Sequence, residues 1–222
     1  MRVCSQKQTI IISIILMLLC GLQQLFADEY NPYSRELKKG VFLVASRNLL
    51  DPNFAQTVVV LIEYSSEGAV GLIINRKTDI RLTKVLPDNR GFLRKRKDTV
   101  FVGGPVGVDQ LLILVHADSN PEDSYKIMND LYLYSNLDAL EDLMKQGEDS
   151  GEFRAYAGYA GWSPGQLDSE VARGDWFVVT ADIESIFSQE PEELWPRLIE
   201  RSTAQWTMSI KRSQADGGRG KT

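Results

Sequence analysis

Cysteine is nearly absent from this chain of 222 residues. The two cysteines, Cys4 and Cys20, both lie within the first 27 residues. A chain that begins at Asp28 would therefore hold no thiol, which excludes structural disulfides, cysteine nucleophiles and thiolate metal sites. Histidine is equally scarce, so a metal site would need His116, the single histidine, together with carboxylates. We interpret His116 as a structural residue and expect neither a metal nor a cofactor.

Phosphate-binding motifs are missing as well. The sequence contains no Gly-x-Gly-x-x-Gly or Walker pattern. Gly103-Gly104 does form a glycine pair after an apolar run, but Pro105 removes an N–H donor that a bound anion would need. We interpret this turn as a place of close backbone packing.

The sequence offers no complete set of residues for nucleophilic hydrolysis. Residues 161–165 do not indicate the nucleophile elbow of a hydrolase, because Pro164 follows the serine. A Ser-His-Asp triad can still be drawn on paper from Ser46 or Ser163, His116 and Asp51. We predict that the chain is not an enzyme, with a hydrolase that uses carboxylates and His116 as the alternative.

A basic surface is also lacking. Outside residues 1–27 the chain carries 23 basic and 30 acidic side chains, a net charge of −7. Binding to the phosphates of nucleic acids requires a basic surface. The basic cluster formed by Arg90 and residues 94–97 is more simply a solvated loop. We therefore expect no direct binding to nucleic acid.

The first 27 residues resemble a secretory signal peptide. Arg2 and Lys7 precede an apolar run from Thr9 to Leu19, and Ala27 stands directly before acidic residues. The run is shorter than an ordinary membrane span of about 20 residues. We expect cleavage after Ala27 and export to the periplasm. The alternatives are an uncleaved inner-membrane anchor, which would be the chain's one contact with a membrane, and a cytoplasmic protein whose start site is misassigned.

The remaining chain has an ordinary globular composition, with 43% hydrophobic and 25% charged residues overall. We predict a signal-peptide-like segment over 1–27, an N-terminal arm over 28–39, one domain over 40–210 and a disordered tail over 211–222. Apolar runs predict strands at Gly40–Ala45, Thr57–Tyr64, Ala69–Asn75, Thr99–Val102, Gln110–Ala117, Phe153–Tyr159 and Trp176–Val179. Tyr125–Tyr134 mixes strand and helix signals, and we favour a strand near its end. Helical patterns lie at Leu82–Leu86, Asn136–Gln146, Gln166–Arg173, Ile183–Phe187 and Glu192–Ile199. Strands and short helices mix without regular βαβ alternation, which favours an α+β fold around a strongly bent sheet.

Five motifs in a fixed order give the chain a resemblance to a known family. They are Asp51–Phe54 with Thr57–Val59, Gly68–Arg76, Gly103–Val106, Gly158–Leu167, and Trp176 followed by Thr180–Asp182 and Leu194-Trp195. Over about residues 40–199 the sequence resembles the YqgE/AlgH family of bacterial proteins. The resemblance implies a single compact α+β domain whose bent, bifurcated sheet forms a pseudo-barrel with short flanking helices.

The same resemblance implies no established enzymatic activity. The AlgH branch carries the label of a transcriptional regulator, so a cytosolic regulator that acts through protein partners is a further alternative. Two features depart from the family. Typical members lack a signal sequence, which argues against a transcriptional role here. Tyr64 and Lys77 stand where many members have His and Pro, which removes one candidate polar contact.

Glycine-rich turns at strand ends predict where a ligand would bind. The stretch 158–166 holds Gly, Pro and Trp between a strand and a helix, a place where ligand sites are often built. If the turns of the five motifs converge, they form a contact surface from Asn53, Arg76, Gly103, Gly104, Tyr159, Trp162 and Gln166. A structural ion pair of Arg76 and a rigid corner plugged by Trp162 are the alternatives. We thus predict a non-enzymatic binding or regulatory module for an unidentified protein or small ligand.

Overall fold

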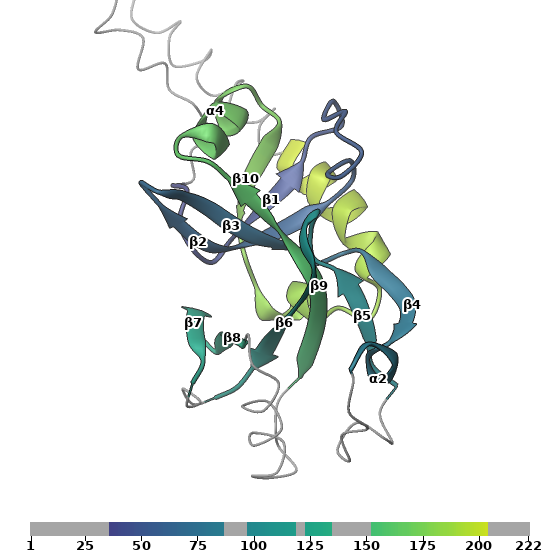
Figure 1. Ribbon diagram of the computed structural model, residues 1–222. Helices are drawn as coiled ribbons and strands as arrows, with labels where there is room; N and C mark the ends of the chain where they lie inside the picture. The colour runs from purple at the N-terminus through teal and green to yellow at the C-terminus, as the bar shows by residue number, and fades with distance from the viewer. Residues whose placement is uncertain (1–35, 87–96, 119–122, 135–151, 204–222) are drawn as a thin grey trace, which may run out of the picture. The chain divides into compact units, whose positions relative to one another are not determined.

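A ten-stranded sheet organises the described part of the chain (Figure 1). The structure is a computed structural model that describes residues 36–86, 97–118, 123–134 and 152–203, all within the compact unit Tyr33–Thr222. The strands are β1 Val41–Ala45, β2 Val58–Ser65, β3 Gly68–Ile73, β4 Lys77–Arg81, β5 Thr99–Val102, β6 Val106–His116, β7 Tyr125–Met128, β8 Leu131–Tyr134, β9 Phe153–Trp162 and β10 Trp176–Thr180. The helices are α2 Leu82–Val85, α4 Gln166–Ala172, α5 Ile183–Ile186 and the 3-10 turn η2 Pro191–Glu193, followed by a helix over the described residues 194–203.

The sheet divides at β9. Its main path runs β10-β1-β2-β3-β9-β6-β8-β7, and β4 and β5 form a branch beside it. The first half of β9, at 155–157, pairs with β5 in parallel and with β6 in antiparallel register. Its second half, at 160–162, pairs with β3. The predicted α+β class and bent, bifurcated sheet are confirmed, and Figure 1 shows β9 as the long strand between the two branches.

The uniform apolar character of β1 and β2 agrees with their place as interior strands of the sheet. All five residues of β1 and the first five of β2 are buried, because both faces of these strands are covered. The helix over 194–203 is tied to β1, since the Trp195 indole donates a hydrogen bond of 2.8 Å to the Ala45 carbonyl. Pro196 lies in the first turn of that helix, where no intrahelical N–H is needed, so the helix starts afresh after η2.

Most predicted strands and helices that fall on described residues match in position, with several corrections. β6 begins four residues before the predicted start at Gln110, and β9 continues three residues beyond the predicted end at Tyr159, through part of the predicted glycine-rich turn. In Tyr125–Tyr134 the strand favoured near the end is present as β8, and a second strand, β7, precedes it in a hairpin whose turn holds Asp130 at a left-handed φ of 61°. β4 was not predicted: its side chains are mostly exposed, and it is a strand because it pairs with β5. The predicted helix Asn136–Gln146, the signal-like segment and the C-terminal tail lie outside the described residues.

Within the described residues, no helix is both long enough and apolar enough to cross a membrane.

Candidate functional site

An open cavity of about 350 Å³ lies between β4, β5, the start of β9 and the segment after α5. Its described lining residues are Lys77, Lys97, Asp98, Thr99, Phe101, Glu152, Phe153, Arg154, Phe187, Gln189 and Pro191. They come from four separate stretches of sequence, which the branching of the sheet at β9 brings together. The lining includes three phenylalanines together with charged residues of both signs.

Arg154 is fixed in the wall of this cavity. Its guanidinium donates hydrogen bonds to the carbonyls of Ile186, at 2.9 Å, and of Ser188. The same group lies over the Phe101 ring, 4.6 Å from the centroid, and 5.9 Å from the Phe187 centroid. Aromatic faces attract cations, so the two rings and the two carbonyls hold the guanidinium in one orientation. Each of these four partners is uncharged.

The Tyr156 hydroxyl lies on the same face of β9 as Arg154. Tyr156 is fully buried, its ring centroid is 5.5 Å from that of Phe101, and its hydroxyl has no hydrogen-bond partner among the described residues. Burial raises the pKa of this hydroxyl, and both the charge of Arg154 and the approach of its side chain to the hydroxyl oppose the shift. The hydroxyl therefore stays protonated at neutral pH, beneath the aromatic part of the cavity wall.

The predicted residues Gly103 and Gly104 lie in the connection between β5 and β6, where its backbone closely approaches that of β9. The Gly103 N–H donates to the Ala157 carbonyl at 2.9 Å, and the Gly103 carbonyl accepts from the Ile73 N–H at 2.8 Å. A Cβ on Gly103 would lie 2.2 Å from the Gly158 oxygen, and one on Gly104 would lie 2.1 Å from the Tyr159 carbonyl carbon. Real Cβ contacts are never this short, so the structure requires glycine at both positions for close backbone approach.

Asn53 and Arg76 come together in a different place. The Arg76 guanidinium donates to the carbonyls of Pro52, Asn53 and Ala55 at 3.1, 2.7 and 3.2 Å. Burial lowers the pKa of Arg76, while the charge of Asp51 acts in the opposite direction. Arg76 thus holds the turn between β1 and β2 through backbone carbonyls, and the described contacts include no salt bridge.

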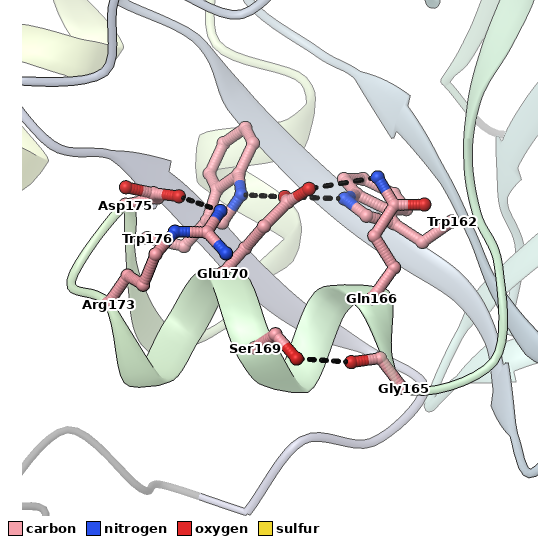
Figure 2. A network of polar contacts seen from close by, with 8 residues as sticks. All are labelled: Trp162, Gly165, Gln166, Ser169, Glu170, Arg173, Asp175 and Trp176. Atoms are coloured by element: carbon pink, nitrogen blue, oxygen red, sulfur yellow. Dashed lines mark hydrogen bonds and ion pairs between the residues drawn. The ribbon is translucent and has the colours of Figure 1, made fainter.

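Trp162 and Gln166 belong to a network centred on Glu170 (Figure 2). One oxygen of the Glu170 carboxylate accepts from both the Trp162 and Trp176 indoles, each at 2.9 Å. The other oxygen accepts from the Gln166 amide at 2.9 Å, and the Gln166 carbonyl accepts from the Ser163 N–H at 3.0 Å. This network fastens the first turn of α4 to the ends of β9 and β10.

The two indoles of that network also form an aromatic cluster with Phe54. The Phe54 ring stacks on Trp162 with centroids 6.0 Å apart and meets Trp176 edge-on at 5.6 Å. On the other side of α4, the Tyr64 hydroxyl donates to Asp168 at 2.6 Å. This hydrogen bond, assisted by burial and by the Asp168 charge, raises the pKa of Tyr64 to about 12.

The seven predicted residues therefore fall into separate groups. Asn53 and Arg76 share one turn, Trp162 and Gln166 share the Glu170 network, and the glycine pair packs on Tyr159, which is half-buried. None of the seven is among the described residues that line the cavity. Arg154, Phe101 and Phe187 were missed; the one available signal was a charged residue within the apolar run that begins at Phe153.

Two residues of the Ser-His-Asp triad considered from the sequence, His116 and Ser163, lie far apart. His116 and Ser163 lie at opposite ends of β9, because the His116 N–H bonds to Glu152, just before the ten-residue strand, and Ser163 follows its last residue. Ten residues of strand span roughly 33 Å when straight. The His116 imidazole packs against Phe187, with centroids 6.2 Å apart. Within the described residues there is no group of three or more His, Cys, Asp or Glu that could hold a metal ion.

Comparison with known proteins connects this chain to one family. A family model described as AlgH-like matches residues 42–207. A UPF0301 protein of Methylococcus capsulatus is 36% identical over 165 residues, which are 73% of this chain and 90% of that relative. A UPF0301 protein of Chlorobaculum tepidum is 34% identical over 164 residues, covering 73% of this chain and 86% of the relative.

Solved structures share the fold. The AlgH protein from Pseudomonas aeruginosa is similar with a TM-score of 0.61 and 30% identity, over 76% of this chain and 90% of that one. A protein from Corynebacterium diphtheriae gives a TM-score of 0.64 at 26% identity, over 75% of this chain and 87% of that one.

Proposed function

The chain belongs to the AlgH-like family, and on that premise we propose that it works as a non-enzymatic binding module whose site is the cavity around Arg154. The family has no assigned biochemical function, so the proposal rests on the cavity itself. The observation that carries it is an open cavity of about 350 Å³ that combines aromatic walls with a fixed guanidinium. Small-molecule sites have this size and this mixture of apolar surface with a few fixed polar groups.

The lining favours binding over catalysis. The described lining residues include no serine, cysteine or histidine, so a nucleophile would have to come from Thr99, a lysine or a carboxylate. Arg154 is held by neutral carbonyls and rings, an arrangement that suits recognition of a charged group. The alternative is a hydrolase that uses carboxylates and His116; Asp98 and Glu152 line the cavity, whereas His116 is not among the described lining residues. Turnover that is lost in Asp98→Asn and Glu152→Gln, with binding retained, would favour that alternative.

A ligand screen tests the binding proposal. Nitrogen-15 spectra of the chain would be recorded with a library of small fragments, with Thr99, Phe101 and Gln189 as reporters of the cavity. Gln189→Trp places an indole at an exposed lining position, and Thr83→Trp places the same group on exposed α2, outside the lining. Fragments that shift the cavity amides should lose this effect in Gln189→Trp and keep it in Thr83→Trp. A screen without any shift at the cavity, or with shifts that both variants leave unchanged, would refute the proposal.

We further propose that this module acts after export, with an unidentified protein or small ligand as its partner and without direct contact to nucleic acid. The support is the basic, apolar and small-residue order of residues 1–27 and the net charge of −7 beyond them. Mass determination of the N-terminus in cells, together with fractionation, tests this. A chain that keeps Met1 and stays in the cytoplasm would contradict export.

A further inference from the structure

We propose that the cavity recognises a small monoanion, a carboxylate joined to a planar apolar group, with Arg154 as the residue that binds the carboxylate. This inference rests on the proposed function, because it names the class of ligand for the same site. Three features of the cavity carry it: the fixed guanidinium, the phenylalanine rings and the charge balance of the lining.

The first feature is the state of the Arg154 guanidinium. Its hydrogen bonds to Ile186 and Ser188 both end on carbonyl oxygens, and its closest aromatic neighbour is Phe101. These contacts fix the group without neutralising its charge. A guanidinium carries five N–H donors, so the two hydrogen bonds leave donors for another acceptor. Its planar fork matches the two oxygens of a carboxylate.

The second feature is the aromatic wall. The rings of Phe101 and Phe187, both lining residues, flank the guanidinium. Phe153 also lines the cavity, but its side chain alternates with that of Arg154 along β9 and packs in an apolar cluster with Ala155. A ligand carboxylate on Arg154 would therefore place the adjoining part of the ligand against phenyl rings. Aromatic side chains favour offset or edge contact with another ring. A planar apolar group beside the carboxylate can make such contacts with the phenyl rings of the cavity.

The third feature is the number of charges in the lining. Lys77 and Lys97 are matched by the carboxylates of Asp98 and Glu152, and Arg154 is the one positive charge in excess among the described lining residues. A single negative charge on the ligand balances this excess. A ligand with two or three negative charges would instead lie close to both carboxylates, and like charges repel. The cavity thus favours a monoanion over a polyphosphate.

The test uses three phenyl probes of matched size, 3-phenylpropanoate, 3-phenylpropanol and 3-phenylpropylamine, and the smaller, ring-free butanoate, all with the full chain. Dissociation constants would come from shifts of the Thr99, Phe101 and Gln189 amides. We expect the phenyl carboxylate to bind about tenfold or more tightly than each of the other three, since it alone supplies both the oxyanion and the ring. Its affinity should fall as salt is added.

Variants at the rim test the charge argument without disturbing the contacts of Arg154. Lys77→Glu should weaken 3-phenylpropanoate about fivefold or more, and Glu152→Gln should strengthen it by a few-fold. Lys84→Glu makes the same charge change on exposed α2, outside the lining, and should have little effect. Arg154→Gln should abolish the preference for carboxylate over alcohol, provided that its spectrum shows a folded chain.

The outcomes separate this inference from the proposed function. If the alcohol or the amine binds the cavity as tightly as the carboxylate does, the inference of a monoanionic ligand is wrong, and the proposal of a binding module is unaffected. The same conclusion follows if all four probes fail while other fragments still shift the cavity amides. If no fragment of any charge reaches the cavity, both proposals fall.

Discussion

At the scale of single residues, Glu170 has a structural role that its place in the sequence does not indicate. It is a charged residue on a short helix, yet its carboxylate joins two indoles and an amide. Trp176 is 1% exposed, so loss of the acceptor would leave a buried N–H without a partner. Its importance therefore comes from the number of donors it satisfies.

Replacement of this carboxylate tests that role. We expect Glu170→Ala to lower the free energy of unfolding by about 2–4 kcal/mol, because hydrogen bonds to charged groups are stronger than neutral ones and a buried donor is orphaned. Urea denaturation followed by tryptophan fluorescence would measure the change. Ser169→Ala, an exposed neighbour with one bond to the Gly165 carbonyl, is the control and should cost less than about 1 kcal/mol. Equal stability of the two variants would show that the indoles find other acceptors.

Tyr64 should make stability depend on pH in the alkaline range. Its pKa in the folded chain is raised to about 12 by the hydrogen bond to Asp168, above the usual value of 10.0. A raised pKa stabilises the fold fully below pH 10, and this contribution is lost as pH rises toward 12, because the unfolded chain releases its proton first. Tyr64→Phe should show a smaller loss of stability over that range. Parallel slopes for Tyr64→Phe and the unsubstituted chain in pH-dependent thermal unfolding would contradict this.

At the scale of elements, the sequence predicts strands that are set by an apolar pattern. It misses strands that form only because they pair with a neighbouring strand. β1 was predictable because each of its residues is apolar and buried. β4 was not, since Lys77–Arg81 has the polar pattern of a loop and becomes a strand through β5. The hairpin of β7 and β8 was not predicted because its turn contains neither glycine nor proline.

The site was harder to predict than the strands for the same reason. Glycine-rich motifs pointed to real constraints, but the constraints at Gly103 and Gly104 are contacts between backbones. The cavity is assembled from four stretches of sequence that carry ordinary residues, and their meeting depends on the branching of the sheet. No local sequence pattern predicts that these four stretches come together in space.

The close approach of the β5–β6 connection to β9 gives a direct test of this interpretation of the glycines. Gly104→Ala should lower the free energy of unfolding by about 3 kcal/mol or more, since its Cβ would lie 2.1 Å from the Tyr159 backbone, which cannot move without breaking pairing. Gly161→Ala is the control on the same strand, because its Cβ would meet only the Tyr159 ring at 3.7 Å. Thermal and urea unfolding of both variants would decide. Similar, small losses would show that this close approach can relax.

At the scale of the whole described unit, two apolar clusters share the same strands. Ile113 and Ala155 belong to the smaller cluster, and their chain neighbours Leu114 and Tyr156 belong to the larger one. Successive residues of a strand point to opposite faces. Each cluster therefore covers one face of β6 and β9, and neither can be exposed without loss of support for the other.

This arrangement should make unfolding a single cooperative transition. We expect the amides of Ile113 and Leu114 to exchange hydrogen through the same global opening, with the same dependence on denaturant. Tryptophan fluorescence, which reports the larger cluster, should coincide with far-ultraviolet circular dichroism. Exchange of Ile113 through a smaller opening, at lower denaturant than Leu114, would instead show that the smaller cluster unfolds separately.

The three pairings of β9 also restrict how relatives of this chain can vary in length. A residue inserted within β9 would shift its register against β3, β5 and β6 at the same time and turn each later side chain to the wrong face. An insertion between β7 and β8 would disturb one hairpin at the end of the sheet. Length changes during the history of the family should therefore collect in loops and outer hairpins, while β9 keeps its ten residues. The branching strand thus serves as a fixed ruler against which homologous sequences can be aligned.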